Sequence, residues 1–216
     1  MESPYPQDSF RKDDETDDEL FYVDPRLVVH VDDNAINSIQ SYYSEVLPEN
    51  ATVLDLMSSW KSHFPKNKQF KKKVGLGLNA TEMANNPELD EFFVQDINAD
   101  PTLPFNANYF DAVVIVVSIQ YVSKPIELFQ EIARILKPNS FCHVIYSNRM
   151  FPTKAVWLWK ALSDDMRAQL VASYFHSTDN FGTPEFKNIT EVSDSPVDPV
   201  FVVSSKNTEM RMNNEL

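Results

Sequence analysis

Short apolar runs and amphipathic segments alternate along most of the chain. Strands are predicted where the runs are too short and too apolar for helices, over residues 52–56, 73–78, 91–95, 109–117, 140–147, 186–192 and 199–204. The run at 109–117 is the most apolar, so it is expected at the centre of the sheet with both faces buried. Strands buried on both faces are typical of parallel sheets.

Helices are predicted between most of these strands. The segments with helical spacing or helix start signals are 33–47, 58–64, 80–86, 125–138 and 163–175. Repeated alternation of strand and helix indicates an α/β layered sheet with right-handed crossovers. The last two strands are separated only by SDSPVDP, which leaves no room for a helix. They are therefore expected to form a hairpin in which one strand is antiparallel to the rest.

The stretch TVLDLMSSWKSHFP, residues 52–65, carries the clearest local signal of a ligand site. It is a strand with a carboxylate near its end, Asp55, followed by a turn at 57–59 and a predicted helix. A helix N-terminus presents free N–H groups, and a carboxylate accepts hydrogen bonds from a polar ligand. In doubly wound sheets such a turn lies at the carboxyl edge, where ligands bind. This turn contains no glycine, although glycine is usual in nucleotide-binding turns.

The charge is uneven along the chain. The formal net charge is −13, and residues 1–24 contain nine acidic and two basic residues. Residues 1–20 are acidic and aperiodic, so they are predicted to be a disordered tail, with a docking segment as the alternative. Residues 21–50 are expected to form an extended approach and a cap helix, and residues 206–216 to be frayed. Nucleic acid is disfavoured as a partner because phosphate binding needs a concentrated positive surface.

Cysteine content and hydropathy indicate a cytoplasmic protein. Cys142 is the single cysteine, so no intrachain disulfide can form, as expected in a reducing compartment. The acidic N-terminus lacks the apolar core of a signal peptide. The longest strongly apolar run, 112–117, is far shorter than the ~20 residues of a membrane helix, so no membrane partner is expected.

Four stretches form a recognisable series along the chain: VLDLMSSW, VGLGLNATEMANNP, FFVQDINADPTLPFNANYFDAVVIVVSIQYVSKP and EIARILKPNSFCHVIYSNR. Together they resemble class I S-adenosylmethionine-dependent methyltransferases of the Rossmann-like kind. DLMSSWKSHFP is also similar to a tract of a glycine-poor subgroup. The resemblance covers roughly residues 50–205 and implies a three-layer fold over 51–205. Its seven-stranded, mostly parallel sheet would end in a C-terminal antiparallel hairpin.

The resemblance also implies positions for the cofactor S-adenosylmethionine. The residues that it assigns to cofactor binding are Asp55, Met57, Ser58, Ser59, Trp60, Asn79, Asp96, Ile97, Ser118 and Gln120. Asn79 stands where the family has an acidic residue that takes both ribose hydroxyls, so cofactor binding is expected to be weaker there. Asp96 would accept the adenine amino group. Two interpretations of the glycine-free turn stay open: serine hydroxyls replace glycine amides at the cofactor, or the site has decayed.

Four residues are candidates for chemistry on the methyl acceptor. His30 precedes the first helix, where the resemblance implies a lid over the substrate, and His63 follows the first motif. Asn148 and Arg149 follow the fifth strand, where an amide and a cation could bind an acceptor carboxylate. The alternative for both histidines is a packing or capping role. His143, within a strand, is predicted to be structural, and no spacing indicates a metal site.

These observations favour a methyltransferase that acts on a small-molecule acceptor by direct in-line transfer. Such a reaction depends on positioning and water exclusion more than on covalent chemistry. The alternative is a catalytically silent methyltransferase-like subunit that binds a partner protein. A nicotinamide-binding Rossmann protein is a third hypothesis, which the terminal hairpin and the missing G-x-G-x-x-G pattern disfavour.

Overall fold

The computed structural model describes residues 5, 6 and 8–208, in which seven strands form one sheet. The strands are β1 (Ala51–Leu56), β2 (Phe70–Gly77), β3 (Glu91–Val94), β4 (Phe110–Val116), β5 (Leu136–Tyr146), β6 (Glu185–Asn188) and β7 (Phe201–Lys206). Their order is β3-β2-β1-β4-β5-β7-β6. β7 pairs antiparallel with both β5 and β6, and the other pairs are parallel. The predicted fold and its terminal hairpin are confirmed.

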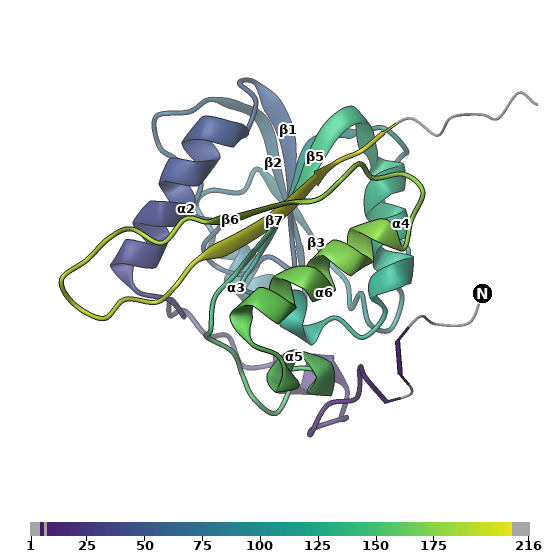
Figure 1. Ribbon diagram of the computed structural model, residues 1–216. Coiled ribbons are helices and arrows are strands. Elements are labelled where there is room, and N and C mark those ends of the chain that lie inside the picture. The colour runs from purple at the N-terminus through teal and green to yellow at the C-terminus, as the bar shows by residue number, and fades with distance from the viewer. Residues whose placement is uncertain (1–4, 7, 209–216) are drawn as a thin grey trace, which may run out of the picture.

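Helices cover both faces of this sheet, as Figure 1 shows. They are α1 (Asp18–Phe21), α2 (Asp33–Val46), α3 (Ala80–Ala84), the 3-10 helix η1 (Ile119–Tyr121), α4 (Pro125–Ile135), α5 (Trp157–Ala161) and α6 (Asp164–His176). α2 packs on one face, against alternate residues of the central strands such as Val53 and Val114. α4 and α6 pack on the opposite face, against the intervening residues such as Leu54 and Val113. The alternation places a separate apolar core on each side.

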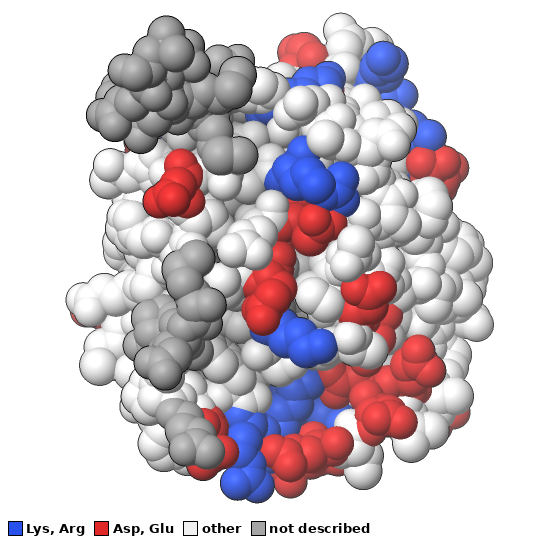
Figure 2. All heavy atoms as spheres, turned by 90° about the vertical axis from the view of Figure 1, so that its right-hand side faces the viewer, with Lys and Arg blue, Asp and Glu red and all other residues white. Residues whose placement is uncertain are grey.

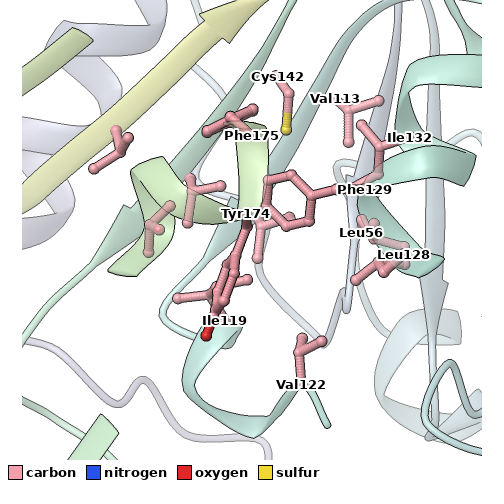
Figure 3. Packing of buried hydrophobic residues seen from close by; sticks show 14 of the residues in the cluster. Leu56, Val113, Ile119, Val122, Leu128, Phe129, Ile132, Cys142, Tyr174 and Phe175 are labelled. Atoms are coloured by element: carbon pink, nitrogen blue, oxygen red, sulfur yellow. The ribbon is translucent and has the colours of Figure 1, made fainter. Parts of the chain in front are cut away.

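The larger core lies between the sheet and the pair α4 and α6. Phe129 of α4 meets Tyr174 and Phe175 of α6 edge to face, at ring-centroid distances of 5.5 and 4.8 Å. Figure 3 shows Cys142 pointing from β5 into this cluster. The thiol is buried and unpaired, and burial raises its pKa above the ordinary range. It is therefore a small core residue rather than a reactive group.

The helix predicted over 58–64 does not form, and residues 57–69 instead connect β1 to β2 as a loop. Asp55 accepts hydrogen bonds from the hydroxyls of Ser58 and Ser62, which gives this segment local partners that compete with helix formation. His63 has a positive φ of 60°, which a right-handed helix does not permit. The loop after β1 therefore offers no helix N-terminus to a ligand.

The disorder predicted for residues 1–20 is corrected for residues 8–20, which follow a defined path. The backbone amides of Trp157 and Leu158 donate to the carbonyls of Arg11 and Ser9, and the amide of Asp14 donates to Thr153. In Figure 1 this purple segment runs past α5. The acidic composition predicts a solvated tail, but the buried side chain of Lys154 forms ion pairs with Asp14 and Asp18 of this segment. Residues 1–4 and 7 lie outside the described residues.

The frayed end predicted from residue 206 also needs correction as far as residue 208. Lys206 is the last residue of β7, and Asn207 beyond it is buried. The Asn207 side-chain amide donates to the carbonyls of Ala133 and Leu136, at 3.0 Å each. A polar side chain thus fastens the end of the sheet to α4. Residues 209–216 lie outside the described residues.

Candidate active site

A cavity of about 680 Å³ opens at the carboxyl ends of the parallel strands. β1 lies between β2 and β4 in the sheet, so the connections leaving β1 and β4 turn to opposite faces there. Such a switch point is where open α/β sheets bind ligands. The loops after β1, β2, β3, β4 and β5 all contribute to the walls, and residues 18–31 cover them from the N-terminal side.

The structure brings together all but one of the predicted site residues. The cavity walls include His30, Asp55, Met57, Ser58, Ser59, Trp60, His63, Asn79, Asp96, Ile97, Ser118, Asn148 and Arg149. The exception is Gln120, which is fully buried outside the cavity lining. Its amide donates to the carbonyls of Val117 and Arg149, at 2.9 and 3.3 Å. Gln120 therefore connects the loops after β4 and β5 instead of lining the cavity.

Asp55 organises the glycine-free loop from inside. Its Oδ2 accepts the hydroxyls of Ser58 and Ser62, both at 2.6 Å. The side-chain amide of Asn86 donates to the Ser62 hydroxyl and to the carbonyl of Ser59, both at 2.9 Å. Burial raises the pKa of Asp55 to about 7, although its two hydroxyl donors oppose that shift. The Ser58 hydroxyl thus stabilises the loop and is not available as a donor to a ligand.

The loop after β1 contains no glycine, but a glycine of the neighbouring strand β2, Gly77, lies against it. The Ser58 amide donates to the carbonyl of Leu76 at 2.8 Å, which presses the loop onto β2. A Cβ at Gly77 would lie 2.2 Å from the Ser58 carbonyl oxygen, so only glycine fits there. Close approach between loop and strand is therefore achieved by Gly77, while Met57 takes the left-handed conformation itself, with a φ of 64°.

Three residues with positive φ line the cavity. Besides Met57 and His63, Val117 at the end of β4 has a φ of 48°. This conformation is an outlier for a β-branched side chain and costs on the order of 1–2 kcal/mol. Such strain tends to gather at functional sites, where the surrounding structure maintains it. The β1 and β4 loops are thus held in conformations that their own residues disfavour.

Residues 18–31 form a strap across the cavity, and side chains of the opposite wall bind its backbone. The Asn79 amide donates to the carbonyls of Tyr22 and Val23, at 2.7 and 3.3 Å. The Trp60 indole donates to the carbonyl of Val28 at 2.8 Å. The strap in this structure is therefore closed over the residues that the sequence assigns to the cofactor.

A buried ion-pair cluster anchors the strap near its start. Lys154 has 0% relative exposure. Its Nζ lies 3.3 Å from Asp14 and from Asp18, and donates to the carbonyl of Thr16 at 2.6 Å. Lys12 pairs with the other oxygen of Asp18 at 2.5 Å. Lys154 was not predicted from the sequence, because an isolated lysine in an aromatic loop gives no sign of its distant acidic partners.

A second anchor joins the far end of the strap to the terminal hairpin. The amide of Asp32 donates to the Asp198 carboxylate at 3.0 Å, and the amide of Asp198 donates back to Asp32 at 2.8 Å. Arg149 approaches the same Asp198 at 3.6 Å with a largely exposed side chain. The predicted acceptor-binding cation is therefore at the rim, beside this anchor.

Aromatic side chains gather where the strap meets the loop after β5. Phe151 contacts the rings of Phe21 and His30 edge to face, at centroid distances of 5.5 and 5.1 Å. The Arg26 guanidinium lies over Phe21 and Phe151, at 4.6 and 5.3 Å. This end of the cavity combines a flat apolar wall with a cation.

Burial favours the neutral form of both candidate histidines. Burial lowers the pKa of His30 below its ordinary value and lowers the pKa of His63 to about 4. A neutral imidazole can accept a proton from an acceptor group. His143, by contrast, is buried within β5 and hydrogen-bonded to the Tyr42 hydroxyl at 2.9 Å, as a structural histidine would be. In the part of the chain that the structure describes, no cluster of acidic, histidine or cysteine side chains could hold a metal ion.

The tryptophans of the loop after β5 lie in different surroundings. Trp159 is fully buried and packs on Tyr146, whereas Trp157 is exposed. Neither lines the cavity. Among the described helices, none has the length and apolar character needed to cross a bilayer.

Comparison with known proteins gives one family match. The family described as "Methyltransferase domain" matches residues 62–144. No functionally curated protein matches the sequence.

Solved structures share the fold at low sequence identity. A chain from the complex of the Haloferax volcanii Trm112 methyltransferase activator with a protein assigned as a methyltransferase is 15% identical, with a TM-score of 0.57 over 82% of this chain and 90% of that one. A Thermotoga maritima S-adenosylmethionine-dependent methyltransferase is 18% identical, with a TM-score of 0.56 over 81% and 89%. Geranyl diphosphate C-methyltransferase of Streptomyces coelicolor, solved with S-adenosylhomocysteine, is 10% identical, with a TM-score of 0.55 over 80% and 77%.

Residues 62–144 thus match a methyltransferase domain, and the chain shares its fold with solved S-adenosylmethionine-dependent methyltransferases.

Proposed function

We propose that the protein transfers a methyl group from S-adenosylmethionine to a small-molecule acceptor. The observation that carries this proposal is the cavity at the switch point, where five strand ends and the strap converge on the predicted site residues. Within this proposal, the chain belongs to the glycine-poor subgroup with a DLMSSW motif. Gly77 supports that placement, because it supplies from β2 the close approach that the loop's own residues lack.

The residues present suit this cofactor. The Ser118 hydroxyl is buried at the cavity wall and has no hydrogen-bond partner among the described residues. A buried unsatisfied hydroxyl calls for an explanation, and a polar ligand in the cavity provides one. Asp96 and Ile97 would hold the adenine, and the loop from Met57 to Trp60, with Ser118, would face the methionine end.

The chain's own contribution to the reaction is orientation and exclusion of water. The bound cofactor would supply an electrophilic methyl group on a sulfonium centre: the acceptor's nucleophile would bond to the methyl carbon as the S–CH3 bond breaks, with S-adenosylhomocysteine as the leaving group. The strap covers the site and keeps water away from the reacting groups. His30, neutral and beside Phe151, would take a proton from an acceptor that starts protonated. Asn148 and Arg149 would bind polar groups of the acceptor at the rim.

The size and cover of the cavity support a small acceptor. Its volume of about 680 Å³ falls within the range of about 300–1,000 Å³ that is usual for small-molecule sites. The face in Figure 2 shows acidic and basic side chains interspersed, without a broad basic area. The net charge of −13 likewise disfavours nucleic acid as the acceptor.

A methyltransferase-like subunit that binds a partner protein is the second candidate. The edge strand β3 supports it, since Phe92, Phe93 and Val94 are exposed beside unpaired backbone groups. A structural neighbour also comes from a complex with a methyltransferase activator.

Titration calorimetry with S-adenosylmethionine and S-adenosylhomocysteine separates the two candidates. The enzyme proposal expects both to bind, and expects Asp96→Ala to weaken binding about tenfold or more. Asp100→Ala is the matched control, since Asp100 is an exposed carboxylate outside the cavity lining. If neither ligand binds the wild-type protein at millimolar concentration, the enzyme proposal fails.

A further inference from the structure

Glu82 is a buried carboxylate in the cavity wall that no sequence motif singles out. It lies in the short helix α3 with 6% relative exposure. Its Oε2 accepts the Ser59 hydroxyl at 2.6 Å, and its Oε1 accepts the backbone amide of Arg26 at 2.7 Å. Both donors are neutral. None of the ion pairs found among the described residues involves Glu82. A buried carboxylate without a cation is costly to keep and needs a reason.

Asn79, by contrast, has no donor left for a ligand. Its carbonyl oxygen caps α3 by accepting the amide of Glu82 at 3.0 Å. The two hydrogens of its side-chain amide go to the carbonyls of Tyr22 and Val23. The residue assigned to the ribose by family position is therefore occupied with holding α3 and the strap.

Glu82 retains the hydrogen-bonding capacity that Asn79 lacks. A carboxylate offers about four lone-pair sites, of which Ser59 and Arg26 use two. Two neighbouring hydroxyl groups can donate to the two oxygens of one carboxylate, and such charge-assisted bonds are about twice as strong as neutral ones.

The other carboxylates of the cavity wall are less suited to this role. Asp18 is paired with Lys12 and Lys154. Asp55 accepts the hydroxyls of Ser58 and Ser62 inside the loop. Asp96, after β3, accepts the amide of Asn98 and is the residue proposed for the adenine. Glu82 is thus the carboxylate closest in the chain to Asn79 that lines the cavity and has no internal cation.

We propose that Glu82 takes the ribose hydroxyls of the cofactor in place of Asn79. The carboxylate that the position after β2 lacks is supplied three residues later, from the first turn of α3. Capping by Asn79 places this turn against the cavity. The proposal rests on the proposed function, because it assumes a ribose-bearing ligand in the cavity.

A thermodynamic cycle between protein and ligand tests this role. S-adenosylhomocysteine and its 2′,3′-dideoxy analogue are titrated calorimetrically into the wild-type full chain and into Glu82→Gln. Glu82→Gln is expected to weaken the binding of S-adenosylhomocysteine about tenfold or more. It is expected to change the affinity for the analogue less than about twofold. Glu82→Asp, which keeps the charge but shortens the side chain, should show the same selectivity and serves if Glu82→Gln does not fold.

Asn79→Ser is the matched control. Serine preserves the N-cap of α3 but removes the amide donors. It is expected to affect the two ligands equally. If the Glu82 variants lost affinity for both ligands equally, Glu82 would serve only to position Ser59 and Arg26, and the proposal would be overturned. The proposal would also be overturned if only Asn79→Ser, and not the Glu82 variants, weakened binding of S-adenosylhomocysteine more than binding of the dideoxy analogue. If the wild-type protein binds neither ligand, the proposed function fails instead.

Discussion

The carbonyl oxygen of Ser58 occupies the space that a Cβ of residue 77 would need. The separation would be 2.2 Å, and the neighbouring Ser58 carbon would be at 3.1 Å. Both atoms belong to the backbone, so neither can move aside without displacing the loop. The β1 loop and β2 are therefore joined through a contact that a single methyl group would break.

Gly77→Ala is expected to displace the loop and to destabilise the fold by about 1–3 kcal/mol, the usual cost of overpacking. Binding of S-adenosylhomocysteine should be weakened more than tenfold, because the loop lines the cavity. Denaturant unfolding and calorimetry measure the two effects. Gly182→Ala is the control, since its nearest neighbours would lie at an ordinary 3.6 Å. It should change stability by less than about 0.5 kcal/mol. Equal effects of the two substitutions would refute the steric account.

Lys154→Met is expected to destabilise the protein by roughly 3 kcal/mol, because Asp14 and Asp18 lose a fully buried cation. Protease sensitivity should rise within residues 8–31. Chemical unfolding and limited proteolysis followed by mass spectrometry provide the measurements.

Lys160→Met provides the comparison for this anchor, because its pair with Asp13 is much more exposed. Lys160→Met should lower the free energy of unfolding by about 1 kcal/mol or less. Unchanged protection of residues 8–31 in Lys154→Met would show that the strap does not depend on this anchor.

Trp60→Phe removes the indole donor to Val28 but keeps an aromatic ring. One hydrogen bond contributes about 0.5–1.5 kcal/mol, so the strap should open more often and S-adenosylhomocysteine should dissociate about 2- to 10-fold faster. Stopped-flow displacement gives this rate. Trp157→Phe, at a 58% exposed position outside the cavity, should leave the rate unchanged. A dissociation rate in Trp60→Phe equal to that of the wild type would count against a gating role of the strap.

Asp55 should make the wild-type protein less stable as pH rises from about 4 to 7. Its pKa is about 7 in the folded state, against an ordinary 3.8, so in this window the folded chain holds a proton that the unfolded chain has released. Stability falls with pH wherever the unfolded state binds fewer protons. His63 acts in the opposite direction between about 4 and 6.5, because its pKa is lowered.

Comparison with Asp55→Asn isolates the aspartate, since His63 is present in both proteins. The free energy of unfolding of the wild type, relative to the variant, should decline by on the order of 2–4 kcal/mol from pH 4 to pH 7. Urea titrations across this range measure it. A difference that does not change with pH would mean that Asp55 is ionised in the folded protein throughout.

Much of the fold could be predicted from the order of apolar runs. The strand at 109–117 was expected at the centre because it is apolar on both faces, and β4 indeed lies in the middle of the sheet order. The hairpin followed from the short acidic connection before β7. The helix predicted over 58–64 does not form, because the hydroxyls of Ser58 and Ser62 donate hydrogen bonds to the Asp55 carboxylate. These hydrogen bonds outweigh the weak helix propensity of the segment.

By itself, the sequence determined the succession of strands and the positions of polar residues at the strand ends. In a parallel sheet these ends meet at one edge, so most of the predicted site residues were certain to lie near each other. Only the tertiary structure decided which of them remain available to a ligand. Asn79 and Ser58 have their hydrogen bonds satisfied by Tyr22, Val23 and Asp55, while Glu82 retains spare acceptor capacity. Such pairings join residues distant in the chain, and local patterns do not encode them.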